Sequence, residues 1–203
     1  QDVSDRLGEE FARAVDLLAA IEGKVVVTGL GKSGLICRKI AATLASTGTP
    51  ALFLHAAEGL HGDIGMLARG DALIAVSNSG STEEVVALVA PARRLGLPVI
   101  AMTGGSDSAL SRAADVCLSI EVAEEACPRG LAPTASTTVT LAVGDALAIA
   151  LLERGGVRAA AELGAASDTA ATAAKRLSQA VSRAVYPLLA VAFTDAPAAS
   201  NSE

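Results

Sequence analysis

Aromatic residues are almost absent from this sequence of 203 residues. It contains no tryptophan, one tyrosine and three phenylalanines, so aromatics make up only 2% of the chain. This scarcity argues against a surface that binds single-stranded nucleic acid by stacking bases on aromatic rings. Apolar residues nevertheless account for 51% of the chain. The core must therefore be built from alanine, valine, leucine and isoleucine, as in an ordinary globular domain.

Positive charge is also scarce. Lysine and arginine together number 16 against 22 aspartates and glutamates, which gives a net charge of −6. A broad basic patch is not expected, so neither nucleic acid nor an anionic membrane is an expected partner. A small anionic ligand is compatible with this charge, because the backbone amides at a helix N-terminus bind phosphate whatever the net charge of the protein.

The sequence has no cysteine pair and no long uninterrupted apolar run. Its three cysteines are far apart in the sequence: Cys37, Cys117 and Cys127. We interpret them as reduced thiols rather than as disulfides or zinc ligands. The longest apolar stretch, 138–152, contains Asp145 and is too short to span a bilayer. The N-terminus is polar and acidic, unlike a signal peptide, and we expect a cytoplasmic protein.

Short aliphatic runs alternate with segments of helical spacing. The runs that predict buried strands are 24–28, 51–54, 71–76, 98–102 and 116–120. The helical patterns cover 5–21, 35–47, a segment ending at 95, and 134–153. This alternation predicts an α/β fold, a parallel sheet with helices on both faces. In such sheets ligands bind beyond the carboxyl ends of the strands, where the polar and glycine-rich turns of this chain lie.

The first of these turns is Gly29-Leu-Gly-Lys-Ser-Gly34, which matches the G-x-G-x-x-G pattern of dinucleotide-binding proteins. A dinucleotide site also needs an acidic residue at the end of the second strand, but His55 stands there. Two interpretations remain open. The segment is either a tight turn that binds nothing, or a helix start whose polar groups, Lys32 and Ser33, bind an anion.

The second turn is Ser77-Asn-Ser-Gly-Ser-Thr-Glu-Glu84. Three hydroxyl side chains surround Gly80, those of Ser77, Ser79 and Thr82. Hydroxyl donors beside the positive end of a helix suit a phosphate dianion. The alternative is an ordinary N-cap, in which Ser79 or Ser81 caps the helix and Glu84 completes a capping box.

The only two histidines, His55 and His61, flank Glu58, and Asp63 follows them. Both imidazoles come just after a predicted strand end, so we expect at least one of them to have a functional role. Their spacing matches no standard zinc pattern. Further along the chain, Glu124 and Glu125 are adjacent in a long loop, where they are either functional or simply solvated.

Taken in order, these segments resemble the sugar isomerase (SIS) domain family. The resemblance rests on Gly29-Leu-Gly-Lys-Ser-Gly34, His61-Gly-Asp-Ile-Gly-Met66, Ser77-Asn-Ser-Gly80, Glu125-Ala-Cys-Pro128 and Leu131-Ala-Pro-Thr134. It runs from about residue 5 to residue 156, and within the family it is closest to the arabinose-5-phosphate isomerases. The Ser-x-Ser-Gly pattern alone marks only the wider phosphosugar superfamily.

The resemblance implies a three-layer α/β/α sandwich with a five-stranded parallel, flavodoxin-like sheet. It also implies a homotetramer with active sites near the subunit interfaces. The implied reaction interconverts D-ribulose 5-phosphate and D-arabinose 5-phosphate, the precursor of Kdo for lipopolysaccharide, through a cis-enediolate without a cofactor or metal. Lys32, His61 and Glu125 match catalytic positions of the family. The positions expected to bind the sugar phosphate are Gly31, Ser33, Ser77, Asn78, Ser79, Thr82 and Thr134, with His55, Glu58 and Asp63 as possible supporting residues.

For catalysis we hypothesise Glu125 as the base, Lys32 as the group that stabilises the oxyanion, and His61 as an acid/base. The roles of Glu125 and His61 are interchangeable at this point.

The chain departs from the family pattern in three places. Ser81 stands where the family usually has an acidic residue, and the Ser-His-Pro-Gly-Gly segment that carries a histidine implicated in catalysis has no counterpart. We expect residues 1–156 to form the SIS domain. Residues 157–203 are expected to be an alanine-rich helical tail with a disordered end, in place of the paired CBS domains of many members. The first two departures, Ser81 and the missing Ser-His-Pro-Gly-Gly segment, affect turnover more than sugar-phosphate binding. The alternatives are therefore a non-catalytic sugar-phosphate-binding module or another phosphosugar isomerase of the superfamily.

Overall fold

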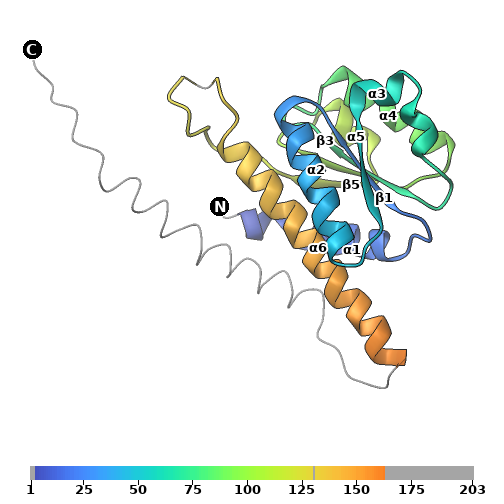
Figure 1. Cartoon of the computed structure of the whole chain (residues 1–203). Helices are drawn as coiled ribbons and strands as arrows, with labels where there is room; N and C mark the ends of the chain where they lie inside the picture. The colour runs from blue at the N-terminus through green and yellow to red at the C-terminus, as the bar shows by residue number, and fades with distance from the viewer. Residues whose placement is uncertain (1–2, 130, 163–203) are drawn as a thin grey trace, which may run out of the picture.

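The computed structural model describes residues 3–129 and 131–162 (Figure 1). The helices are α1 (Val3–Ala19), α2 (Gly31–Ser46), α3 (Ala56–Leu60), the 3-10 turn η1 (Asp63–Met66), α4 (Glu83–Arg94), α5 (Ala109–Ala113) and α6 (Ala135–Glu162). The strands are β1 (Val25–Gly29), β2 (Ala51–His55), β3 (Ala72–Val76), β4 (Val99–Thr103) and β5 (Val116–Ser119). Most of the tail predicted for 157–203 lies outside the described residues.

The five strands form one parallel sheet in the order β2-β1-β3-β4-β5. Every residue of β1, β3 and β4 is buried, which explains why these strands have continuous aliphatic sequences instead of alternating ones. The chain places β2 on one side of β1 and β3 on the other, so Gly29 at the end of β1 pairs with both His55 and Val76. The predicted parallel sheet is confirmed.

Helices cover both faces of the sheet (Figure 1). Side chains of α1, α2 and α6 pack on one face in a core that contains Phe11, Ile40 and Leu147. Side chains of α3, α4 and α5 pack on the other face in a second core that contains Leu88 and Leu110. The fold is therefore the three-layer α/β/α sandwich, with an aliphatic interior as the composition requires.

Some helix boundaries differ from the prediction. Helix α2 begins at Gly31, so the second half of the glycine-rich segment belongs to the helix and not to the turn. Helix α6 continues to Glu162 rather than ending at Glu153. The short elements α3, η1 and α5 were not predicted, because four or five residues are too few to display a helical period.

Among the described residues, one helical segment is long and apolar enough by composition to cross a bilayer, Ala135–Gly155 of α6. This segment is a few residues longer at each end than the apolar stretch 138–152 of the sequence. The segment packs against α2 so closely that a Cβ at Gly144 would lie 2.4 Å from Cγ1 of Ile40. Asp145 itself forms an ion pair with Lys39 of α2. A core helix of this kind passes the same compositional test as a membrane span.

Two carboxylates accept hydrogen bonds from backbone N–H groups at the amino edge of the sheet. The carboxylate of Asp71, just before β3, accepts hydrogen bonds from the backbone N–H of Lys24 at 2.9 Å, from Lys24 Nζ at 2.7 Å and from the backbone N–H of Ala68 at 2.9 Å. Burial alone would raise the pKa of Asp71, but the hydrogen bonds from Lys24 outweigh it and hold that pKa below its ordinary value. Asp115 accepts in the same way from the backbone N–H of Val99, at 2.8 Å.

We expect Asp71→Asn to lower the free energy of unfolding by about 1–3 kcal/mol, the usual contribution of hydrogen bonds to a buried charged group. The asparagine side chain would place an NH₂ group where a carboxylate oxygen now accepts hydrogen bonds from Lys24 and Ala68, so at least one of these donors would lose its partner. The measurement is urea unfolding near neutral pH. Asp107→Asn is the matched control, since the side chain of Asp107 is 90% exposed in its ion pair with Arg112, and its effect should stay below about 0.5 kcal/mol. Equal stabilities for the two variants would contradict this account.

Candidate functional site

The site begins where the order of the strands reverses. Strands β1 and β3 are neighbours, but the chain leaves β1 toward β2 and leaves β3 toward β4. The connections that follow β1 and β3 therefore diverge and leave a crevice between them, the usual ligand position in open parallel sheets. Gly29–Gly34 and Ser77–Thr82 follow these two strands, so the sheet brings the two predicted turns to one edge.

Two long helices start at this edge without side-chain caps. The N-cap residue of α2 is Leu30 and that of α4 is Thr82, and neither makes a capping hydrogen bond through its side chain. By contrast, α5 begins with a complete capping box between Ser108 and Ser111. An uncapped helix start leaves several backbone N–H groups without intrahelical partners, and the helix dipole adds positive potential there. Together the two starts favour a bound anion.

We call residues Ser77–Thr82 the hydroxyl turn. Ser77 is 2% exposed, and its Oγ lies 2.8 Å from Oγ1 of Thr82 and accepts a hydrogen bond from the N–H of Gly80 at 3.1 Å. Ser79 is exposed, and its Oγ accepts from the N–H and the hydroxyl of Ser81, at 3.3 and 3.1 Å. The hydroxyls thus bond to one another and to the turn. The alternative in which Ser79 or Ser81 caps α4 is wrong, because Thr82 is the N-cap residue.

Lys32 and Ser33 lie in the first turn of α2, next to the hydroxyl turn along the sheet edge, and Lys32 is exposed. Gly31 has a φ of +58°, which a side chain would strain, so the chain turns sharply from β1 into the helix. Asn78 is exposed at the tip of the hydroxyl turn. The expected phosphate-binding residues of these two segments therefore lie on one edge of the sheet.

The two histidines have different surroundings. His55 ends β2 and is half-buried, with its ring edge-on to Phe53 at a centroid distance of 6.2 Å. Its Nδ1 atom is buried and has no hydrogen-bond partner among the described residues. The guanidinium of Arg38 lies 4.5 Å from the centre of the Phe53 ring, a cation–π contact that the sequence did not predict. His61 follows α3 and is exposed, as are Glu58 and Asp63.

Glu125 is tied into its own loop. Its carboxylate accepts hydrogen bonds from the N–H of Thr134 at 2.7 Å, the hydroxyl of Thr134 at 3.0 Å, the N–H of Ser136 at 3.4 Å and the hydroxyl of Ser136. These bonds, above all the one from the Ser136 hydroxyl, lower the pKa of Glu125 to about 2. The sequence suggested Thr134 as a phosphate ligand, but its hydroxyl is occupied by Glu125. Ser136 was not a predicted site residue.

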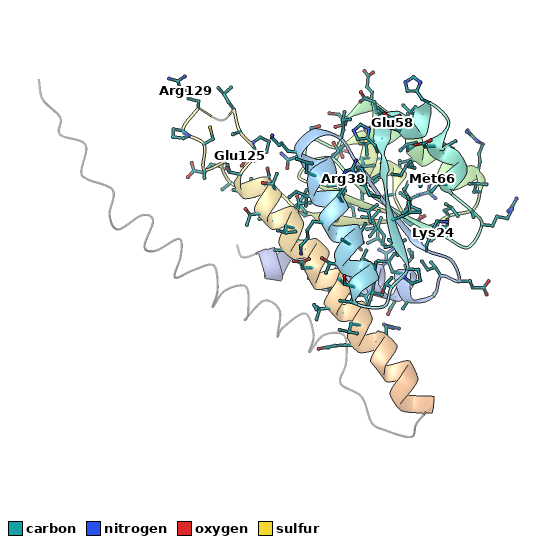
Figure 2. The ribbon with its side chains drawn as sticks, viewed as in Figure 1. Lys24, Arg38, Glu58, Met66, Glu125 and Arg129 are labelled. Atoms are coloured by element: carbon teal, nitrogen blue, oxygen red, sulfur yellow. The ribbon has the colours of Figure 1, made fainter. Side chains whose placement is uncertain are left out.

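The structure thus assembles part of the predicted site. It joins the start of α2 to the hydroxyl turn, and Glu125 to Thr134. Figure 2 shows Glu58 of α3 well apart from Glu125 at the start of α6, with Arg38 of α2 between them in this view. No group of three or more histidine, cysteine, aspartate or glutamate side chains in the described part of the chain is placed to hold a metal ion.

Three comparisons place these features among known proteins. The SIS domain family matches residues 18–150. An arabinose 5-phosphate isomerase KdsD of Pseudomonas aeruginosa is 57% identical over 154 residues, which cover 76% of this chain and 47% of that protein. The enzyme of the same name from Escherichia coli K12 is 51% identical over 158 residues, which cover 78% of this chain and 48% of that protein. The chain thus spans about half the length of the curated relatives it matches.

Among solved structures, an Escherichia coli CFT073 protein in complex with arabinose 5-phosphate superposes with a TM-score of 0.72 and 44% identity, covering 80% of this chain and 88% of that one.

The hydrogen bonds of Glu125 predict a pH dependence. Its folded pKa lies below the ordinary value of 4.5, so its contribution to stability is complete above that value and is lost as the pH falls toward about 2. We expect Glu125→Gln to be less stable than the wild type above about pH 5 and equally stable near pH 2. Urea unfolding across this range measures the difference. The control is Glu124→Gln, which changes the exposed neighbour; a gap of the same size and pH dependence for Glu124→Gln would refute the assignment.

Proposed function

Because this chain belongs to the SIS domain family, we propose that it is an aldose–ketose isomerase that interconverts D-ribulose 5-phosphate and D-arabinose 5-phosphate. The observation that carries the proposal is the pair of uncapped helix starts, α2 and α4, on either side of the strand reversal. A phosphate dianion held there would satisfy the N–H groups that no side chain caps. The names of the relatives and the arabinose 5-phosphate complex of a 44% identical protein support the choice of sugar.

In this proposal the phosphate binds at the hydroxyl turn. Ser79 and Thr82 contribute hydroxyls, and the first turn of α4 contributes backbone N–H groups. Ser33 adds a hydroxyl from the neighbouring start of α2. Lys32, exposed on the same turn of α2, supplies an ammonium group at the edge where the sugar carbons would extend from the phosphate. A cation near C1 and C2 would stabilise the oxyanion of a cis-enediolate.

Proton transfer between C1 and C2 needs a base whose pKa lies near the working pH. Glu125, with a pKa of about 2 and four hydrogen bonds to its carboxylate, is a weak proton acceptor in this arrangement. An imidazole titrates close to neutrality. We therefore assign the proton transfer to His61 instead of Glu125, and Glu125 orders the loop before α6. The chemistry requires no cofactor.

The second candidate function is a non-catalytic sugar-phosphate-binding module. It is favoured by the separation of Glu58 and Met66, which bound the segment with His61, from Glu125 (Figure 2), and by Ser81 in place of the family's usual acidic residue. Another phosphosugar isomerase activity would use the same phosphate site with a different sugar. Supply of a lipopolysaccharide precursor in the cytoplasm follows from the first candidate alone.

The proposed enzyme works as a homo-oligomer, a tetramer by analogy with the family. Large apolar side chains are exposed along the outer layer formed by α2 and α6, with Leu35 60% and Leu152 47% exposed. Figure 1 shows that α6 lies along the outside of α2, and none of the described helices covers its outer side. A second copy of the chain packed on this layer would bury the exposed leucines. It would also bring new residues toward the loop before α6 that carries Glu125.

The activity is tested by following solvent deuterium incorporation and conversion of D-ribulose 5-phosphate by purified protein. We expect His61→Asn to lower turnover by about 10²–10⁴-fold, the usual contribution of a positioned acid or base. The affinity for ribulose 5-phosphate should barely change, because the phosphate is held by other residues. Arg69→Gln, an exposed change on the loop that precedes β3, is the control and should keep full activity.

Two results would be decisive against this assignment. A wild-type protein that binds ribulose 5-phosphate but exchanges no deuterium is a binding module. Full activity in His61→Asn leaves the isomerase reaction in place and removes His61 from it.

For the assembly, we expect light scattering at micromolar concentration to detect a dimer or larger species. Leu35→Glu should shift the population toward monomer without unfolding the domain, because it places a charge in the buried interface. The control is Ala90→Glu, an exposed change on α4 in the opposite helix layer, which should leave the mass unchanged. A monomeric wild-type protein would exclude the proposal.

A further inference from the structure

A second turn packs against the hydroxyl turn on the side of β4, the strand next to β3. We call residues Thr103–Ser108, which join β4 to α5, the support turn. The N–H of Gly104 donates to the backbone oxygen of Asn78 at 2.9 Å, and the hydroxyl of Thr103 donates to the same oxygen at 3.4 Å. One residue into α5, the N–H of Leu110 donates to the backbone oxygen of Gly80 at 3.0 Å. Two carbonyls of the hydroxyl turn are thus held on the side of the support turn.

The two turns touch without room for a side chain between them. Gly80 has a φ of +66°, and a Cβ there would lie 2.0 Å from Oγ of Ser108 and 2.7 Å from Oγ1 of Thr103. A Cβ on Gly105 would lie 2.8 Å from the backbone oxygen of Ser79. The glycines on both sides therefore allow a backbone contact that fixes the distance between the turns.

The support turn is anchored independently of any ligand. Leu110 is fully buried in the core below α4 and α5. Ser108 and Ser111 exchange hydrogen bonds of 2.9 and 3.2 Å in the capping box of α5. Oγ1 of Thr103, a residue 1% exposed, accepts from the N–H of Gly105 at 3.0 Å while its proton goes to Asn78. The Thr103 hydroxyl therefore links the support turn to the hydroxyl turn.

We propose that Thr103 and Ser108 are positioning residues for phosphate binding, which hold the carbonyls of the hydroxyl turn away from the crevice. A carbonyl oxygen that faced the crevice would repel a phosphate, whereas one turned back leaves the N–H dipoles of the turn to face it. Thr103 acts through its hydroxyl, and Ser108 acts by contact with Gly80 and by capping α5. The inference rests on the proposed function for the identity of the sugar, but it applies to any phosphomonoester bound at this turn.

The test compares variants at two buried threonines. Thr103→Val keeps the shape of the side chain and removes its hydroxyl, and Thr103→Ser restores the hydroxyl. The matched control is Thr28→Val in β1, where the Oγ1 of Thr28 is buried and has no partner among the described residues. Calorimetry with inorganic phosphate and with D-ribulose 5-phosphate measures affinity. We expect Thr103→Val to weaken binding by about tenfold, the effect of one hydrogen bond, while Thr103→Ser and Thr28→Val bind like the wild type.

In turnover the change should appear in KM, with kcat retained, because a phosphate-positioning residue does not move protons. Wild-type affinity in Thr103→Val would overturn the inference. A wild-type protein that binds phosphate without isomerising any sugar refutes the proposed function and leaves this inference standing. If the wild type binds no phosphate, the inference falls together with the proposed function. In the free protein the amide NMR resonances of Ser79 and Gly80 report the geometry of the turn. They should shift in Thr103→Val and not in Thr28→Val, and unshifted resonances overturn the inference.

Discussion

Complete burial of three central strands is the constraint on which the rest of the molecule depends. With β1, β3 and β4 covered on both faces, every polar backbone group inside the sheet must pair with a neighbouring strand. Unpaired polar groups can therefore collect only at the two ends of the strands. Because all five strands are parallel, one end presents amide donors and the other presents the turns that enter the next helices. The reversal of strand order between β1 and β3 then selects where on that second edge a ligand fits.

The two edges of the sheet differ in the groups that they present: carboxylate acceptors at the amino edge and unpaired helix N–H donors at the carboxyl edge. At the amino edge the carboxylates of Asp71 and Asp115 accept from strand amides and leave little there for an anion to bind. At the carboxyl edge, α5 is capped by Ser108, whereas the starts of α2 and α4 are left open. A fourth helix start, that of α6, is occupied by the carboxylate of Glu125. Among these four helices the caps distinguish the starts of α2 and α4, which can serve an anion, from those of α5 and α6, although the short helix α3 also begins without a side-chain cap.

The strands and the hydroxyl turn could be predicted from the sequence, because aliphatic runs and clustered hydroxyls are local signals. The α/β sandwich, the parallel sheet and the motifs of the SIS family all followed from such signals. The hydrogen bonds of Glu125 could not be predicted, since Ser136 caps it from eleven residues away across a loop. The contact of the support turn with Gly80 could not be predicted either. The Thr-Gly-Gly sequence at the end of β4 is a local signal, but nothing in the sequence indicates that it packs against the hydroxyl turn. The cation–π contact of Arg38 depends on the pairing of α2 with the edge strand β2.

The all-parallel sheet also determines how early the binding edge can exist while the chain folds. Within the described sheet no two neighbouring strands are joined by a hairpin, so each pairing requires a helical crossover and closes a long loop first. The crevice forms only after β1 has paired with β3. The Gly80 carbonyl of the hydroxyl turn is held only after the N–H of Leu110 is in place to donate to it. A nascent chain that ends before this residue would have the Ser-Asn-Ser-Gly motif without the geometry on which the proposed anion site depends. The binding edge is therefore a product of long-range order and completes late, although each of its motifs is only a few residues long.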